Sequence, residues 1–206
     1  MVLDREKKLQ WLWVGLFGTV FIWSAYQPKD GLTWFLEVFP ALAAFAILAL
    51  TYRRFPLTPL LYGLILIHCI ILMVGGHYTY AEVPLFTDLQ HWVGGERNNF
   101  DKLGHFAQGF VPALVARELF IRLQIVKDGW RNIVIVGFCL GISAFYELIE
   151  WWVALLSDEA AEAFLGTQGY VWDTQSDMGF ALFGAICALL FLASWHDKQL
   201  QAVQSR

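Results

Sequence analysis

The sequence predicts an all-α protein: a polytopic membrane bundle of six transmembrane helices. Hydrophobic residues make up 58% of the 206-residue chain, and its mean hydropathy is +0.52. Soluble domains are typically about 45–50% apolar. The composition therefore indicates a membrane protein, and the apolar segments define its architecture.

Six apolar segments are long enough to be considered as spans, because a helix needs about 20 residues to cross about 30 Å of hydrocarbon. They cover residues 11–26, 34–52, 57–75, 103–122, 131–156 and 176–195. The first segment lacks a small-residue cleavage pattern, so we expect it to be retained rather than removed as a signal peptide. No internal repeat or flexible linker divides the chain, which predicts a single membrane domain over residues 1–206.

The distribution of charge predicts the orientation in the membrane, because Lys and Arg in short loops stay on the cytoplasmic side. With six spans, 11 of the 14 basic residues fall on the side of the termini, and 13 of the 18 acidic residues fall outside or in the outer half. This places the N- and C-termini in the cytoplasm. Two long outer loops, residues 76–102 and 157–175, are expected to be ordered and to fold over the helix ends. The second should contain one amphipathic turn that ends at Gly166.

The sequence supports neither nucleic-acid binding nor a structural or metal-binding role for its cysteines. No basic patch with exposed aromatic residues is present, so a nucleic-acid partner is not expected. The three cysteines, Cys69, Cys139 and Cys187, lie in apolar segments without metal-ligand spacing, so neither a disulfide framework nor a cysteine metal site is expected.

Polar residues are concentrated where three consecutive segments meet the outer side. Residues three or four apart share one face of a helix. The stretch "NNFDKLGHFAQGF" contains Asp101 and His105 four apart, with Gln108 continuing the stripe. The other two segments contribute the pairs Glu147 with Glu150 and Asp173 with Asp177. The six side chains of these pairs should therefore meet at one depth.

Asp101, Asp173 and Glu147 each have a structural explanation as well. Asp101 and Asp173 could simply be carboxylates at helix starts, where the helix dipole favours them. Glu147 lies deeper, where an ionised side chain costs at least about 2.5–3.5 kcal/mol unless it is paired or neutralised. Glu147 could still be a protonated packing residue, but His105 is its natural partner, able to carry charge, bind a metal or relay a proton.

Three other polar residues are interpreted less specifically. His77, in "GGHYTY", is a candidate ligand or gate in the outer loop, or equally a solvated loop histidine. His68 is expected to be a packing residue. Glu37 is most simply an acid in the first turn of the second helix, favoured by the helix dipole.

Carboxylates with one imidazole suit a divalent metal ion, the candidate cofactor, with positions left for water. We expect hydrolysis or group transfer on a membrane lipid or a lipid-linked envelope substrate, because the site faces outward from within the membrane. The expected metal ligands are Asp101, His105, Glu147, Asp173 and Asp177; the expected catalytic groups are Glu150 and His105; and the expected substrate contacts are Lys102, Gln108 and His77. A proton-coupled carrier and a non-catalytic scaffold remain alternatives, and no HExxH or CxxC motif selects zinc.

Once these residues are assembled, the second half of the chain resembles the VanZ-like family of small membrane proteins. "FDKLGHF" and "WDTQSDMGFALFG" match that family at Asp101, Lys102, His105 and Asp173, and Glu147 or Glu150 fills its acidic position. Asp177 stands where the family usually has Asn, and Phe180 where it usually has Gly, whereas Gly184 fits. VanZ itself is associated with glycopeptide-antibiotic resistance, so this resemblance implies an envelope-facing role.

The whole chain, including "GGHYTYAEVPLF", also resembles the YjdF family of bacterial inner-membrane proteins. This resemblance implies an inner-membrane location and no particular reaction, since the function of that family is not established.

Overall fold

The computed structural model describes residues 2–93, 98–156 and 171–204, and this part of the chain is helical without strands. The helices are α1 (Val2–Ala25), α2 (Gly31–Thr51), α3 (Pro59–His77), α4 (Pro84–Val93), α5 (Phe100–Arg122), α6 (Asp128–Ala154) and α8 (Asp173–Gln204). The prediction of an all-α membrane protein is confirmed.

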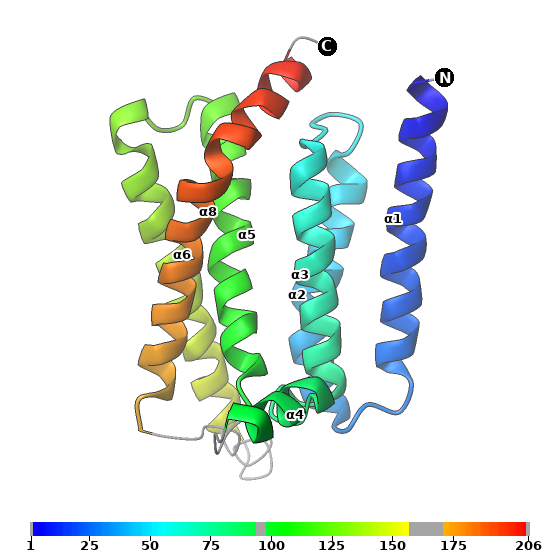
Figure 1. The fold of residues 1–206 in the computed structure, drawn as a ribbon, viewed down its shortest axis with the longest axis vertical. Coiled ribbons are helices and arrows are strands. Elements are labelled where there is room, and N and C mark those ends of the chain that lie inside the picture. Colours follow the sequence, from blue (N-terminus) through cyan, green and yellow to red (C-terminus); the bar gives the residue numbers. More distant parts are fainter. Residues whose placement is uncertain (1, 94–97, 157–170, 205–206) are drawn as a thin grey trace.

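The long helices lie side by side, and α4 lies across one end of the bundle (Figure 1). Both termini lie at the opposite end. We call these two ends the α4 end and the terminal end. In between, α3 packs against α1, α2 and α5, whereas α5, α6 and α8 pack against one another.

Four of the described helices, α2, α3, α6 and α8, are long and apolar enough to cross a membrane. The helices α1 and α5 have 24 and 23 residues, enough for a span, but they carry clusters of charged side chains near their ends. Those charges lower the hydropathy of both helices, so composition alone supports four spans and not the predicted six.

Most helix bounds differ from the predicted segments, because hydropathy marks only the part of a helix suited to lipid. The first helix begins at Val2 instead of residue 11, and α8 continues to Gln204, beyond residue 195. Hydrogen bonding along a helix does not stop where the apolar run stops. The predicted loop 76–102 contains α4 and the first turn of α5. Of the predicted loop 157–175, residues 157–170, including the expected turn at Gly166, lie outside the described residues.

Small residues bring α5 and α8 into close contact. A Cβ atom on Gly109 would lie 1.8 Å from the backbone oxygen of Ala181, and one on Gly184 would lie 2.1 Å from the backbone oxygen of Phe106. Neither position has room for a side chain. Glycine therefore lets the two backbones touch, as small residues commonly do between membrane helices.

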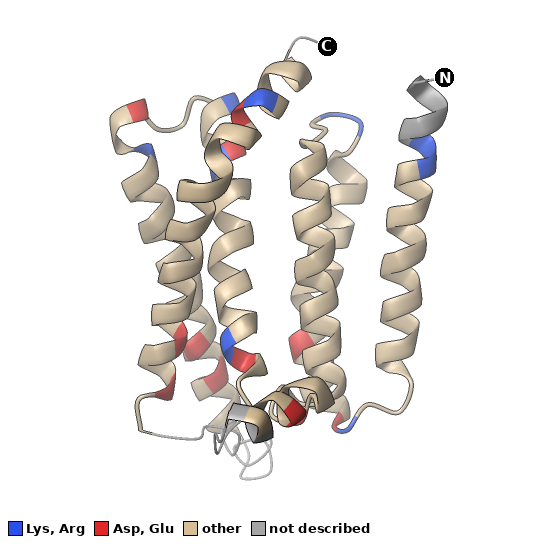
Figure 2. Cartoon of the chain, in the orientation of Figure 1, with Lys and Arg blue, Asp and Glu red and all other residues tan. Residues whose placement is uncertain are grey.

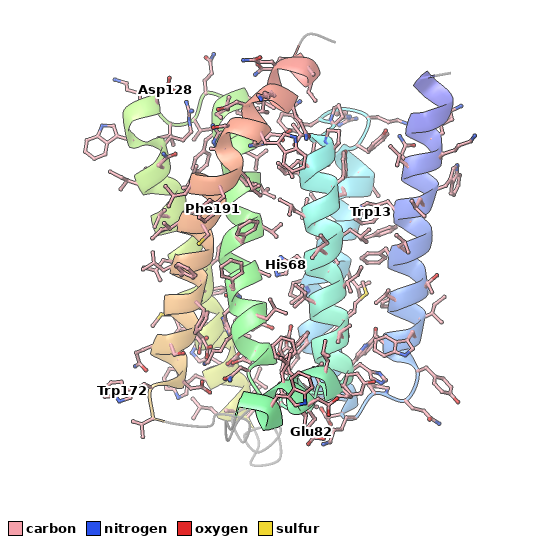
Figure 3. All side chains as sticks on the ribbon, in the orientation of Figure 1. Trp13, His68, Glu82, Asp128, Trp172 and Phe191 are labelled. Carbon is pink, nitrogen blue, oxygen red and sulfur yellow. The ribbon has the colours of Figure 1, made fainter. Side chains whose placement is uncertain are left out.

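Apolar side chains divide into an inward core and an outward surface. Leu61, Met73 and Leu114 are fully buried between the helices. Leu50 and Phe191 are 80% and 75% exposed, and Figure 3 shows Phe191 on the outside of α8. An outer surface of exposed aliphatic and aromatic side chains fits a protein surrounded by hydrocarbon.

A buried polar network joins α3, α5 and α8 near the terminal end. Glu118 of α5 is completely buried and accepts hydrogen bonds from the backbone nitrogen and the hydroxyl of Thr58, at 3.2 and 2.8 Å. It also lies 2.8 Å from Arg122 Nη1 and 2.9 Å from His196 Nε2. One carboxylate thus satisfies the start of α3 and holds two neighbouring cationic or imidazole groups.

Candidate functional site

The chain directions of three helices bring the predicted site residues to one level. The helices α5 and α8 both begin at the α4 end, and α6 ends there (Figure 1). The first turns of α5 and α8 therefore lie beside the last turns of α6. Many Asp and Glu residues lie at this end of the bundle, and most Lys and Arg residues lie at the terminal end (Figure 2).

Lys102 lies inside the acidic cluster. Its Nζ atom is 2.5 Å from Asp173 Oδ1 and 2.5 Å from Asp177 Oδ1, and the residue is only 7% exposed. The two aspartates come from α8 and are themselves buried. This double ion pair ties the start of α5 to the start of α8. It also shows that Asp173 does more than cap its own helix.

His105 is surrounded by carboxylates on one side of its ring. Its Nε2 atom lies 3.4 Å from Asp101 Oδ1, 3.6 Å from Glu147 Oε1 and 3.9 Å from Asp177 Oδ1. The other ring nitrogen, Nδ1, lies 3.2 Å from Gln108 Oε1. An amide oxygen can only accept a hydrogen bond, so this contact places a proton on Nδ1 and turns Nε2 toward the three carboxylates.

Glu147 has a buried carboxylate oxygen without a hydrogen-bond partner among the described residues. The residue is 7% exposed, and this oxygen is Oε1, the one nearest His105. Buried polar atoms are normally hydrogen-bonded, so an unsatisfied one needs an explanation. A cation between Glu147 and His105 would provide it.

Two overlapping groups have the spacing of metal ligands. One is Asp101, His105 and Asp177, the other is His105, Glu147 and Glu150, and within each group the ligand atoms lie within 4.8 Å of one another. Ligand atoms about 2.0–2.2 Å from a tetrahedral Zn²⁺ lie about 3.3–3.6 Å from one another. The distances of 3.4 to 3.9 Å from His105 Nε2 to the three carboxylate oxygens are close to this separation between ligand atoms. They are too long for good hydrogen bonds. Asp173, a predicted ligand, belongs to neither group and lies against Lys102.

The charges of the cluster also favour a cation. Five carboxylates surround one ammonium group, that of Lys102, and one imidazole, that of His105. The carboxylates belong to Asp101, Glu147, Glu150, Asp173 and Asp177. Buried charges in a low-dielectric environment require compensation from a partner or a metal. The cluster can therefore bind a divalent ion, or it can hold protons that neutralise some of the acids.

Glu37 belongs with this cluster, which corrects the prediction that it is a first-turn acid. The helix α2 begins at Gly31 and has no acidic residue in its first turn. Glu37 is 8% exposed, and its Oε2 atom accepts a 2.8 Å hydrogen bond from the hydroxyl of Tyr146 on α6. The signal for it was present in the sequence: an acid within an apolar segment, the same feature that singled out Glu147.

A second tyrosine approaches Glu37 from the connection after α3. Tyr80 fits between two glycines, since a Cβ on Gly75 or Gly104 would lie 2.3 or 2.9 Å from its ring. Thr79 and Tyr80 both have left-handed backbone conformations, with φ of 57° and 58°. Such strain persists only where surrounding structure holds it, often at functional sites. Burial raises the pKa of the Tyr80 phenol, and the neighbouring Glu37 carboxylate raises it further.

His77 lies in a different environment from the predicted one. It is in the last turn of α3 and not in a loop. Its Nδ1 atom lies 3.0 Å from the backbone oxygen of Ser24, and its ring is 4.6 Å from that of Trp23. These contacts fix the end of α3 against the end of α1. The structure thus gives His77 neighbours from α1 and does not group it with the ligand atoms around His105.

The fold and this cluster define a class: a helical membrane protein with a buried acidic–histidine site at one end of its bundle. The chain belongs to the family described as predicted membrane protein, DUF2238, whose model matches residues 9–198. It is 53% identical over 184 residues to the protein named Inner membrane protein YjdF of Escherichia coli (strain K12), with 88% of each chain covered. No solved structure matches the chain.

These relationships confirm the predicted YjdF family membership and support a location in a membrane. They do not bear on the VanZ-like resemblance of the second half, which stays a prediction.

Proposed function

We propose that this protein crosses the inner membrane six times and binds a divalent cation at an outward-facing site. There it carries out hydrolysis or group transfer on a lipid or an envelope substrate. The observation that carries this proposal is the arrangement around His105, where three carboxylate oxygens lie within 3.9 Å of Nε2 and one of them has no hydrogen-bond partner among the described residues.

The proposed orientation of the protein in the membrane rests on the distribution of charge and on the positions of the termini. Both termini lie at the end where most Lys and Arg residues gather, as six spans would require (Figures 1 and 2). Basic residues near membrane helices favour the cytoplasmic side. The α4 end, with the acidic cluster, then faces outward. In this arrangement α1 and α5 cross the membrane with the four more apolar helices.

The ligand roles follow from the distances. His105 would hold the ion together with Asp101, Glu147 and Asp177, whose oxygens lie within 3.9 Å of its Nε2. Glu150, which has ligand spacing to His105 and Glu147, would serve as acid or base. A bound divalent ion polarises a substrate oxygen and lowers the pKa of bound water. Gln108 would orient His105 through Nδ1, as carbonyl oxygens commonly do for metal-binding histidines. Lys102 and Asp173 would form the wall of the site nearest the substrate.

A proton-coupled carrier is the second candidate, and one observation favours it. The hydrogen bond from Tyr146 to Glu37 extends the titratable groups from α8 and α5 through α6 to α2. Chains of acids and histidine inside a bundle also occur on proton paths. In that case His105 would carry the positive charge itself, and no metal would be required.

Metal analysis of the purified protein separates the two candidates. We expect close to one divalent ion per chain in the wild-type protein, and loss of most of it in Asp177→Ala and in Glu147→Gln. Asp88→Asn is the matched control, because Asp88 is an exposed acid on α4. The protein is purified in chelator-free buffer with added Zn²⁺ or Mn²⁺. Absence of stoichiometric metal from the wild-type protein would refute the metal-dependent function and leave the proton-coupled carrier as the candidate.

The orientation has its own test. A reporter fused to the C-terminus should be active when it requires the cytoplasm. Activity only for a reporter that requires the periplasm would contradict the topology without affecting the metal analysis.

A further inference from the structure

A groove of about 680 Å³ opens beside the acidic cluster, between α4, α5 and α8. It is lined by Phe86, Asn99, Lys102, Leu103, Phe106, Ser176 and Phe180. Lys102 belongs both to this lining and to the cluster, since it bonds Asp173 and Asp177. The groove therefore borders the candidate site at Lys102, although none of the proposed metal ligands lines it. Its volume lies within the range of about 300–1,000 Å³ common for small-molecule sites.

The polarity of the groove changes along the helix axes. Asn99 precedes the first residue of α5, and Ser176 lies in the first turn of α8. Phe106 is seven residues beyond Asn99, which is about 10 Å deeper along the axis at the rise of an α-helix. Phe180 lies one turn beyond Ser176. The hydrogen-bonding groups of α5 and α8 are thus at the α4 end, beside Phe86 of α4, and the aromatic groups of α5 and α8 are deeper in the bundle.

We propose that this groove binds one membrane lipid with a phosphate-bearing head group. The hydrocarbon chain lies along Leu103, Phe106 and Phe180, and the head lies at Asn99, Lys102 and Ser176. The inference names a substrate class for the proposed function and rests on it for the reaction, but lipid binding itself does not require the metal.

The chemistry of the lining favours this occupant. Lys102 provides a positive charge, and the amide of Asn99 and the hydroxyl of Ser176 provide hydrogen-bond donors, all suited to phosphate oxygens. The starts of α5 and α8 add positive helix-dipole ends at the same level. Asp173 and Asp177 oppose an anion; Lys102 balances one of these two negative charges, and a cation at the adjacent site would balance the other. Deeper in the groove, the side chains of Leu103, Phe106 and Phe180 form an apolar surface that favours an apolar ligand.

The competing explanation is ordinary surrounding lipid, because large apolar side chains are exposed around the whole bundle. Surrounding lipid would contact Phe35 on α2, which is 50% exposed, as readily as Phe180, which is 39% exposed. A lipid held in the groove would instead contact the lining of α5 and α8 preferentially. This difference can be measured.

The experiment uses the full-length protein in vesicles that contain a photoactivatable phosphatidylglycerol, with cross-linked peptides mapped by mass spectrometry. We expect cross-links concentrated on the groove lining rather than near Phe35. In Ser176→Trp, whose indole would fill the groove, the groove cross-links should fall at least fivefold. Gln175→Trp is the matched control, because Gln175 is the exposed neighbour that does not line the groove. Equal labelling near Phe35 and Phe180, with no effect of Ser176→Trp, would show surrounding lipid only and overturn the proposal.

A second probe tests the head group. A photoactivatable diacylglycerol with the same chains should label the groove several-fold less, and equal labelling would overturn the phosphate part of the proposal. Metal content is measured on the same preparation. Groove labelling in metal-free protein would refute only the proposed function, whereas metal binding without groove labelling would refute only the lipid site.

Discussion

The hydroxyl of Tyr146 donates a 2.8 Å hydrogen bond to Glu37, and this bond joins the acidic cluster on α5, α6 and α8 to α2. The ring of Tyr146 also packs edge to face against that of His105, with the ring centroids 6.5 Å apart. Tyr146 therefore interacts with both the histidine and a buried carboxylate that are distant in the sequence. The buried polar residues therefore extend to α2 and are not confined to the helices of the second half of the chain.

Tyr146→Phe should destabilise the protein by about 1–3 kcal/mol, because it leaves a buried carboxylate oxygen without its donor. The change keeps the ring and removes only the hydroxyl. Denaturant unfolding in mixed micelles measures the loss. Tyr26→Phe is the control, since Tyr26 is 70% exposed and should have little effect.

A double-mutant cycle with Glu37→Gln distinguishes a direct bond from separate effects. Directly bonded residues show interaction free energies of about 0.5–3 kcal/mol, whereas independent sites add within about 0.3–0.5 kcal/mol. Additive losses from Tyr146→Phe and Glu37→Gln would mean that the two side chains do not support each other.

Local spacing explains how much of the site was predictable. Asp101 with His105 and Asp173 with Asp177 are four apart, so helical geometry alone placed each pair on one face. The prediction that these pairs lie at the same depth in the membrane also depended only on the direction in which each helix crosses it. The partner of Lys102 could not be predicted, because an ion pair between residues more than 70 positions apart depends on how α5 packs on α8.

Glu37 and Tyr80 show the limit of that approach. The start of α2 was placed three residues late, at residue 34 instead of Gly31, and this error turned a buried second-turn acid into a first-turn one. Tyr80 depends on two left-handed residues and on space beside Gly75 and Gly104. Neither the backbone conformation nor the contact has a periodic signal. Periodicity predicted the helices, and it could not predict the side chains that cross between them.

Gln108→Leu should weaken metal binding about 10–100-fold, the usual effect of losing a group that orients a metal ligand. Leucine keeps the approximate size and cannot accept a hydrogen bond from the Nδ1–H group of His105. Competition with a chelator of known affinity measures the change. Gln108→Glu restores an acceptor and should recover most of the affinity. If both variants bind metal as wild type does, Gln108 does not orient His105.

Glu118→Ala should cost about 3–5 kcal/mol, the range for removing one partner of a buried ion pair. The change leaves Thr58, Arg122 and His196 without the carboxylate that accepts from them. Glu82→Ala is the comparison, because Glu82 pairs with Lys29 and both side chains are about half exposed. An exposed pair contributes at most about 1 kcal/mol. Unfolding in mixed micelles should therefore separate the two variants clearly, and equal losses would contradict a special role for Glu118.

Gly184→Ala should separate α5 from α8, and with them Lys102 from its two aspartates. The added Cβ would lie 2.1 Å from the backbone oxygen of Phe106, and backbone cannot move aside as a flexible side chain can. We expect a loss of about 1–3 kcal/mol or more from overpacking. Gly137→Ala on α6 is the matched control, because nothing lies within 4 Å of its added Cβ and alanine favours helix by about 1 kcal/mol. Since Asp177 is on the same helix as Gly184, Gly184→Ala should also lower the bound metal, while Gly137→Ala should not. Reduced stability with full metal content would show that the metal site does not depend on the close contact of α5 and α8.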